Sequence, residues 1–93
     1  MDRREAKAIV GAELQKYRSQ SYEELLRLRS SVEDYSVVGP SGTRYGIEVQ
    51  AFWDSGRPGN LRVRAAIDDG GISAFLPLCR DFIISPDGGF VGE

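Results

Sequence analysis

The chain changes its pattern of apolar and polar positions once, near Val32. In residues 2–18, four apolar side chains recur at spacings of three and four, the period of an amphipathic helix. They are Ile9, Val10, Leu14 and Tyr17. This spacing predicts a first helix from Asp2 to about Arg18, with one narrow apolar face.

A capping signal follows the first helix. Ser21 and Glu24 have the spacing of a capping box, in which each side chain bonds the backbone N–H of the other residue. The box predicts a second helix over residues 22–30. Its candidate buried residues are Leu25, Leu26 and Leu28. The alternative is one long helix that bends near Gln20, because neither Ser nor Gln interrupts a helix by itself.

Strict alternation replaces the helical period in residues 45–53 and 61–68, and it is typical of strands with one buried face. If Asp54 and Asn60 pair across the intervening loop, the apolar side chains of both strands fall on one face. The resulting pairs are Trp53 with Leu61, Ala51 with Val63, Val49 with Ala65, and Ile47 with Ile67. A shift of one residue would destroy this match, so the pattern specifies the register.

Turn signals on both sides extend these strands into a meander. Residues 40–42, Pro-Ser-Gly, predict a three-residue hairpin loop that places Val37 opposite Tyr45. Residues 69–70, Asp-Gly, predict a type I′ turn into a strand that ends before Pro77. The expected pairs of that strand are Ile67 with Ile72, Ala65 with Ala74, and Val63 with Leu76.

The end of the chain predicts one more short strand. Residues 82–84 are aromatic and β-branched, as strands favour. Residues 85–88, Ser-Pro-Asp-Gly, then predict a turn that lets Phe90 and Val91 fold back. This tail could cover the outer face of the sheet.

All four prolines and ten of the eleven glycines lie in the second, strand-rich part of the chain. Helices first and strands afterwards are typical of an α+β domain. We therefore expect a single α+β domain over residues 1–93. One or two helices of residues 1–31 would cover one face of a four- to five-stranded antiparallel meander formed by residues 32–93.

Composition excludes several classes of function. The 93 residues contain no histidine and one cysteine, Cys79, so Ser-His-Asp catalysis, Cys-His catalysis and an intrachain disulfide are excluded. Cys79 is expected to be a small buried apolar residue. Twelve basic and fourteen acidic side chains give a net charge of -2, which argues against nucleic acid. We expect no metal or other cofactor, no membrane span and a cytoplasmic location.

The outer face of the predicted sheet carries the candidate binding residues. The register places Phe52 opposite Arg62, and it places Arg64 between Gln50 and Phe75. The candidates are Glu48, Gln50, Phe52, Arg62, Arg64 and Phe75. Arginine and aromatic residues are enriched at interface centres, which favours a non-enzymatic interaction or regulatory module that binds a protein or its own copy. The alternative is a solvated face with Arg stacked on Phe.

Two further functions remain open at this point. A small enzyme or ligand binder could use the carboxylates of Glu48, Asp54 and Asp68, if a concave pocket brought them together. A weak binder of single-stranded nucleic acid could stack bases on the aromatic side chains of the outer face. The acidic residues near the same strands argue against the second.

The second half of the chain contains four distinctive segments, namely residues 45–54 (YGIEVQAFWD), 62–64 (RVR), 67–71 (IDDGG) and 85–93, in which SPDG precedes FVGE. With these segments the chain resembles a small uncharacterised bacterial protein family. The resemblance covers about the last fifty residues. It implies a bacterial cytosolic protein with no assigned activity, and it transfers no catalytic residue to any position.

Overall fold

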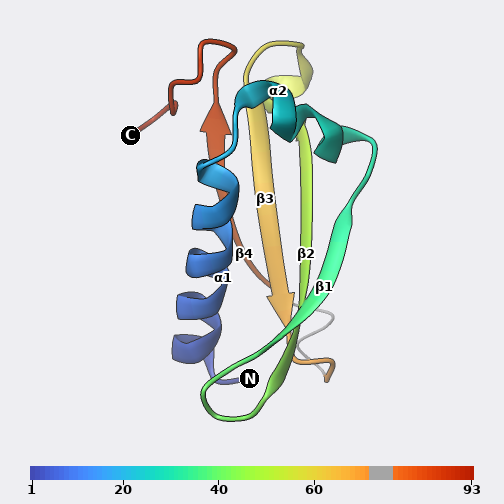
Figure 1. Cartoon of the computed structure of the whole chain (residues 1–93), viewed down its shortest axis with the longest axis vertical. Helices are drawn as coiled ribbons and strands as arrows, with labels where there is room; N and C mark the ends of the chain where they lie inside the picture. Colours follow the sequence, from blue (N-terminus) through green and yellow to red (C-terminus); the bar gives the residue numbers. More distant parts are fainter. Residues whose placement is uncertain (72–76) are drawn as a thin grey trace.

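A computed structural model of the chain describes residues 1–71 and 77–93. It confirms the α+β architecture, with helices on one face of an antiparallel sheet of strand order β1-β2-β3-β4 (Figure 1). The strands are β1 (Glu33–Val38), β2 (Arg44–Trp53), β3 (Leu61–Asp68) and β4 (Leu78–Ile84). The helices are α1 (Arg3–Arg18), α2 (Tyr22–Leu25) and the short 3₁₀ helices η1 (Leu26–Arg29) and η2 (Asp54–Gly56).

The helical segment is divided as the capping box predicts. The Ser21 Oγ accepts a hydrogen bond from the Glu24 N–H at 3.1 Å, and the Glu24 carboxylate accepts one from the Ser21 N–H at 2.9 Å. The prediction of two helices is confirmed, and the alternative of one long helix is wrong. The second helix is α-helical for four residues and then tightens into η1.

The register of the first three strands is confirmed at every predicted pair. Trp53 lies opposite Leu61 and Val37 lies opposite Tyr45. Between β1 and β2 the Gly39 N–H bonds the Thr43 carbonyl at 2.8 Å, which leaves the expected three residues, 40–42, at the turn. Gly42 adopts a φ of +88° that other residues rarely adopt. These turns and the alternation agree with each other, so local sequence specifies this part of the sheet.

The predicted partner of β3 is wrong. The structure pairs β3 with β4, and the pairs are Ile67 with Leu78, Ala65 with Arg80, and Val63 with Phe82. The segment that the Asp-Gly signal assigned to this position, residues 72–76, lies outside the described residues. The strand begins directly after Pro77, where the missing N–H of proline removes no bond from the ladder.

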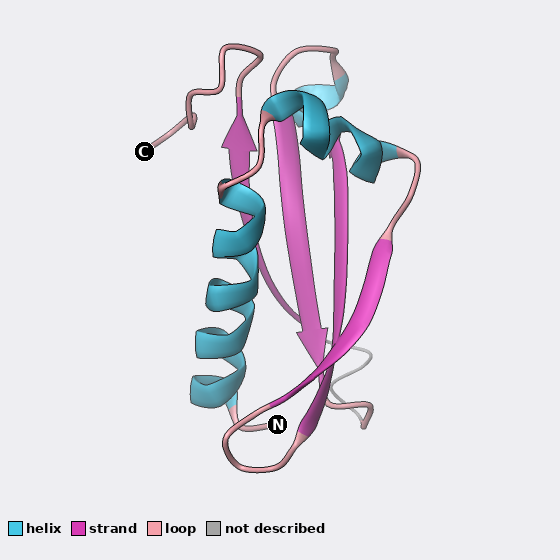
Figure 2. Ribbon diagram, viewed as in Figure 1, coloured by secondary structure: helices cyan, strands magenta, loops and turns pink. Residues whose placement is uncertain are grey.

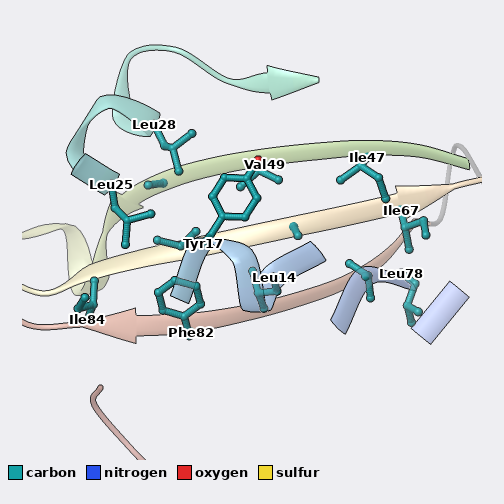
Figure 3. Packing of buried hydrophobic residues seen from close by; sticks show 14 of the residues in the cluster. Leu14, Tyr17, Leu25, Leu28, Ile47, Val49, Ile67, Leu78, Phe82 and Ile84 are labelled. Carbon is teal, nitrogen blue, oxygen red and sulfur yellow. The ribbon is translucent and has the colours of Figure 1, made fainter. Parts of the chain in front are cut away.

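The buried side chains form one cluster between the helices and the inner face of the sheet (Figure 3). Leu14 and Tyr17 of α1 lie in the same layer as Phe82 of β4, and Leu25 and Leu28 of the second helical segment extend this layer over β2. Partly buried side chains complete it, and these are Met1, Ile9, Tyr22, Leu26, Tyr35, Val37, Trp53 and Phe90.

Polar contacts fasten the β1–β2 hairpin to α1. The Glu5 carboxylate accepts hydrogen bonds from the Ser41 Oγ, from the Ser41 N–H and from the Tyr45 hydroxyl. The bonds from Ser41 and then Tyr45 lower the pKa of Glu5, and the bond to Glu5 raises the pKa of Tyr45 to about 12. A Cβ added at Gly39 would lie 2.7 Å from the Glu5 Oε1, so Glu5 occupies the space of a side chain there.

A second polar contact lies further along α1. Glu13 is almost fully buried, and its carboxylate accepts a hydrogen bond from the Tyr35 hydroxyl at 2.8 Å and pairs with Lys16 at 2.9 Å. Burial is the main cause that raises the pKa of Tyr35. The hairpin is therefore held by side-chain hydrogen bonds at two levels of the helix.

Candidate interaction surface

The outer face of the sheet is the face opposite the helices, and three rows of side chains cross its centre. In the first, Glu48 lies opposite Ala66, which lies opposite Cys79. The second row is Gln50, Arg64 and Asp81, and the third is Phe52, Arg62 and Ile83. Four of the six predicted site residues, Gln50, Phe52, Arg62 and Arg64, therefore share two neighbouring rows.

Arg62 is fully engaged by carboxylates. Its guanidinium pairs with Asp54 at 3.0 Å and with Asp81 at 3.1 Å. Hydrogen bonds to Asp54 and then to Asp81 hold the pKa of Arg62 above its ordinary value. This arginine therefore serves mainly to join the η2 loop to β4 across the face.

Arg64 has a different environment from Arg62. Asp81 is its direct neighbour on β4, but the Asp81 carboxylate turns diagonally to Arg62. The Arg64 guanidinium instead lies over the ring of Phe52, 4.9 Å from the ring centroid. In the described part of the chain it makes no ion pair. Stacking orients this side chain while its hydrogen-bond donors keep their capacity for a ligand.

The two remaining predicted site residues are Glu48 and Phe75. Glu48 is exposed in the neighbouring row, so it lies at the margin of the Phe52–Arg64 pair. Phe75, predicted to lie opposite Arg64, lies outside the described residues, and its predicted position is wrong because Asp81 occupies it.

Sequence reasoning missed the contribution of β4 to this face. Asp81 and Ile83 lie opposite Arg64 and Arg62. A signal was present in the apolar residues Leu78, Phe82 and Ile84, which share one parity and are all buried. Arg80 interrupts this alternation and masked it. Cys79 of the same strand is exposed, so the expectation of a buried cysteine is wrong.

The C-terminal tail lies on the helix side of the sheet (Figure 2). Phe90 forms an isolated bridge to Ile84, and its ring meets the ring of Phe82 edge-on at 5.6 Å. The Arg18 guanidinium lies 4.1 Å from the centroid of Phe90 and also bonds the Glu93 carboxylate. The tail therefore does not cover the outer face, because its contacts are with α1 and the inner face.

The carboxylates of the alternative enzyme or ligand site do not converge. Asp54 is bound to Arg62, and Asp68 accepts a hydrogen bond from the Gly70 N–H at 2.8 Å. Asp68 lies opposite Gly46, and Gly46 lies eight residues before Asp54, which directly follows β2. At about 3.3 Å per residue, the two carboxylates are about 26 Å apart along the sheet. Within residues 1–71 and 77–93, no group of three or more metal-type ligands forms.

Two grooves lie away from this face. One, of about 350 Å³, is lined by Arg18, Tyr22, Phe90 and neighbouring residues at the junction of the helices and the tail. The other, of about 440 Å³, lies between α1 and Pro40 and has Ala8, Ile9 and Ala12 on its wall. Neither includes a predicted site residue, so the grooves and the outer face are separate features.

The fold and the face together define an α+β domain with helices on one side of its sheet and an arginine–aromatic pair on the other. Comparison with models of protein families, with curated proteins and with solved structures finds no match to this chain. The resemblance to a bacterial family stays a prediction. Across the described residues, no helix is long and apolar enough to span a bilayer.

Proposed function

We propose that the chain is a non-enzymatic interaction module that binds a protein partner through its outer sheet face, with Phe52 and Arg64 at the centre. The observation that carries this proposal is the contrast between the two arginines. Arg62 has two carboxylate partners, whereas Arg64 has an aromatic platform and no carboxylate in the described part of the chain.

The chemistry of the pair suggests the chemistry of the partner. A guanidinium presents planar donors that match a carboxylate, and stacking on Phe52 lowers the entropy cost of holding it in place. Phe52 and Ile83 lie on the two sides of Arg62 and add half-buried apolar surface. A protein segment with an Asp or Glu next to an apolar side chain would match this arrangement.

Substitution of Arg64 tests the proposal. Arg64→Ala and Phe52→Ala would each weaken a purified partner's binding at least tenfold, because arginine and aromatic residues dominate interface energies. Arg3→Ala is the matched control, since Arg3 is exposed on the opposite side of the molecule and makes no ion pair in the described chain. Arg64→Lys keeps the charge and loses the planar donors, so it would restore less than half of the lost binding energy.

The experiment begins with quantitative affinity capture from the source cells and continues with titration of each purified candidate. Circular dichroism of every variant shows whether it is folded. Equal dissociation constants for wild type, Arg64→Ala and Phe52→Ala would overturn the proposal. Binding of a single-stranded oligonucleotide that weakens steeply with added salt would replace the protein partner by nucleic acid.

A further inference from the structure

The strand β1 forms one edge of the sheet in the described chain. The Gly39 N–H donates to the Thr43 carbonyl at 2.8 Å, which starts the ladder between β1 and β2. Antiparallel ladders alternate between bonded and non-bonded positions, so Val37, Tyr35 and Glu33 bond to β2. The backbone groups of the intervening residues, Asp34, Ser36 and Val38, therefore point outward along the edge.

Apolar side chains flank this edge at both ends. Val32 is 50% exposed and Val38 is 55% exposed, and they are two of the three exposed large apolar residues of the described chain. Both have the parity of the outer face. An open edge that carries exposed valines is a template for pairing with another strand.

Two opposite charges also lie near the edge without an ion pair in the described chain. The Arg44 guanidinium donates a hydrogen bond to the Ser36 Oγ at 3.1 Å, which holds it over Ser36 on the outer face. Asp34 is exposed on the same face of β1. Within one chain, Asp34 lies opposite Glu48, a like charge.

We infer that β1 pairs antiparallel with β1 of a second copy about a two-fold axis through Tyr35, which forms one continuous eight-stranded sheet. In this register Asp34 lies opposite Ser36 of the second copy, and Val32 lies opposite Val38 of the second copy. The Arg44 held over Ser36 then meets Asp34 of the second copy. By two-fold symmetry this ion pair forms twice. The pairing also covers the four valines of the edge, Val32 and Val38 of each copy.

Neighbouring registers fit less well. An axis through Asp34 would oppose the two Asp34 carboxylates, which is destabilising. An axis through Ser36 would set Asp34 against Val38 of the second copy and leave Val32 unpaired. Registers that shift by one residue would place inner side chains on the outer face. The Tyr35-centred register alone pairs the valines and the charges together.

This dimer goes beyond the proposed function and is independent of it. Because the axis runs perpendicular to the sheet, the outer faces of both copies would lie on the same side. The two Phe52–Arg64 pairs would then face one partner together. Arg64→Ala leaves β1 unchanged, so loss of partner binding and loss of the dimer are separate outcomes.

A charge exchange tests the dimer. Light scattering and analytical ultracentrifugation over a dilution series would give the mass of two 10.3 kDa chains for wild type. Asp34→Arg and Arg44→Asp would each raise the dimer dissociation constant at least tenfold, because each sets like charges together. The double variant Asp34→Arg with Arg44→Asp would restore the dimer. Glu23→Arg with Lys7→Asp is a matched exchange of exposed helix residues away from the edge and would leave the wild-type mass.

A disulfide trap tests the register. In a Cys79→Ser background, Val32→Cys with Val38→Cys would form covalent dimers on mild oxidation, because bonded antiparallel pairs lie about 5.5 Å apart, within disulfide range. Either cysteine alone would give no covalent dimer on a non-reducing gel, because residue 32 lies opposite residue 38 of the second copy and not opposite itself. A wild-type monomer at the highest concentration would overturn the inference. So would a dimer that neither charge variant weakens, or one that the paired cysteines do not trap.

Discussion

The two edges of the sheet are held in different ways. The β4 edge packs beside α1, and the tail closes its end through the Phe90 ring and a hydrogen bond from the Val91 N–H to the Ile83 carbonyl at 2.9 Å. The β1 edge is fastened by the polar contacts of Glu5 and Glu13. Aromatic packing secures one edge. The other is positioned by hydrogen bonds donated to the carboxylates of α1, and within the described chain its outward backbone groups face no further strand.

The largest expected effect is on the β4 side, at Phe82. Phe82→Ala would lower the free energy of unfolding by about 3–5 kcal/mol, because the ring is buried against α1 and Phe90. Phe52→Ala is the matched control on the outer face and would cost about 1 kcal/mol, mainly the stack with Arg64. Urea unfolding followed by Trp53 fluorescence measures both. Equal losses would show that Phe82 is not a core residue.

The next effect is on the tail. Phe90→Ala would cost about 1.5 kcal/mol, because the half-buried ring contacts both Phe82 and Arg18. Amide hydrogen exchange gives the sharper result, since the Val91 N–H would lose its protection while the amides of β2 keep theirs. Uniform loss of protection across the sheet would contradict the view that the tail closes this edge locally.

The smallest expected effect on the free energy of unfolding is on the β1 side, at the hydrogen bond between Tyr45 and Glu5, and it depends on pH. The pKa of Glu5 is lowered in the folded chain, so its stabilisation is present above its ordinary pKa of 4.5 and is lost as the pH falls. The pKa of Tyr45 is raised to about 12, so its stabilisation is present below its ordinary pKa of 10 and is lost as the pH rises through 12.

Tyr45→Phe removes the hydroxyl and keeps the ring. The difference in unfolding free energy between wild type and this variant would therefore be constant between about pH 5 and pH 10, and it would shrink on both sides. Unfolding in urea at a series of pH values measures it. Phe82→Ala is the contrast, because its cost would not vary in this way. A Tyr45→Phe difference that is the same at every pH would refute the role of Glu5.

The sequence predicted the β1 side better than the β4 side, for a physical reason. In the hairpins up to β3, loop chemistry and alternation specify the same pairs, as in Trp53 with Leu61. Beyond β3, the Asp-Gly signal and the apolar pairs it offered competed with Phe82 and Ile84, which the structure buries. A local sequence pattern cannot predict the burial of Phe82 and Ile84, because that burial depends on α1 at the other end of the chain.

The candidate site also has one part that the sequence predicted and one part that it did not. The cross-strand positions of Phe52 and Arg64 follow from register alone, so they were predictable. The diagonal choice of Asp81 for Arg62 was not, since it requires the correct strand beside β3. The difference between Arg62, which is paired with carboxylates, and Arg64, which is stacked on Phe52, is visible only when β2, β3 and β4 are placed side by side.

The contact between Gly39 and Glu5 has an evolutionary consequence. The carboxylate occupies the space of a Cβ at position 39, and its bonds to Ser41 and Tyr45 hold it there. The two positions should therefore covary in divergent relatives. Chains that carry a side chain at position 39 should have a shorter or uncharged residue at position 5, and those that retain Glu5 should retain the glycine.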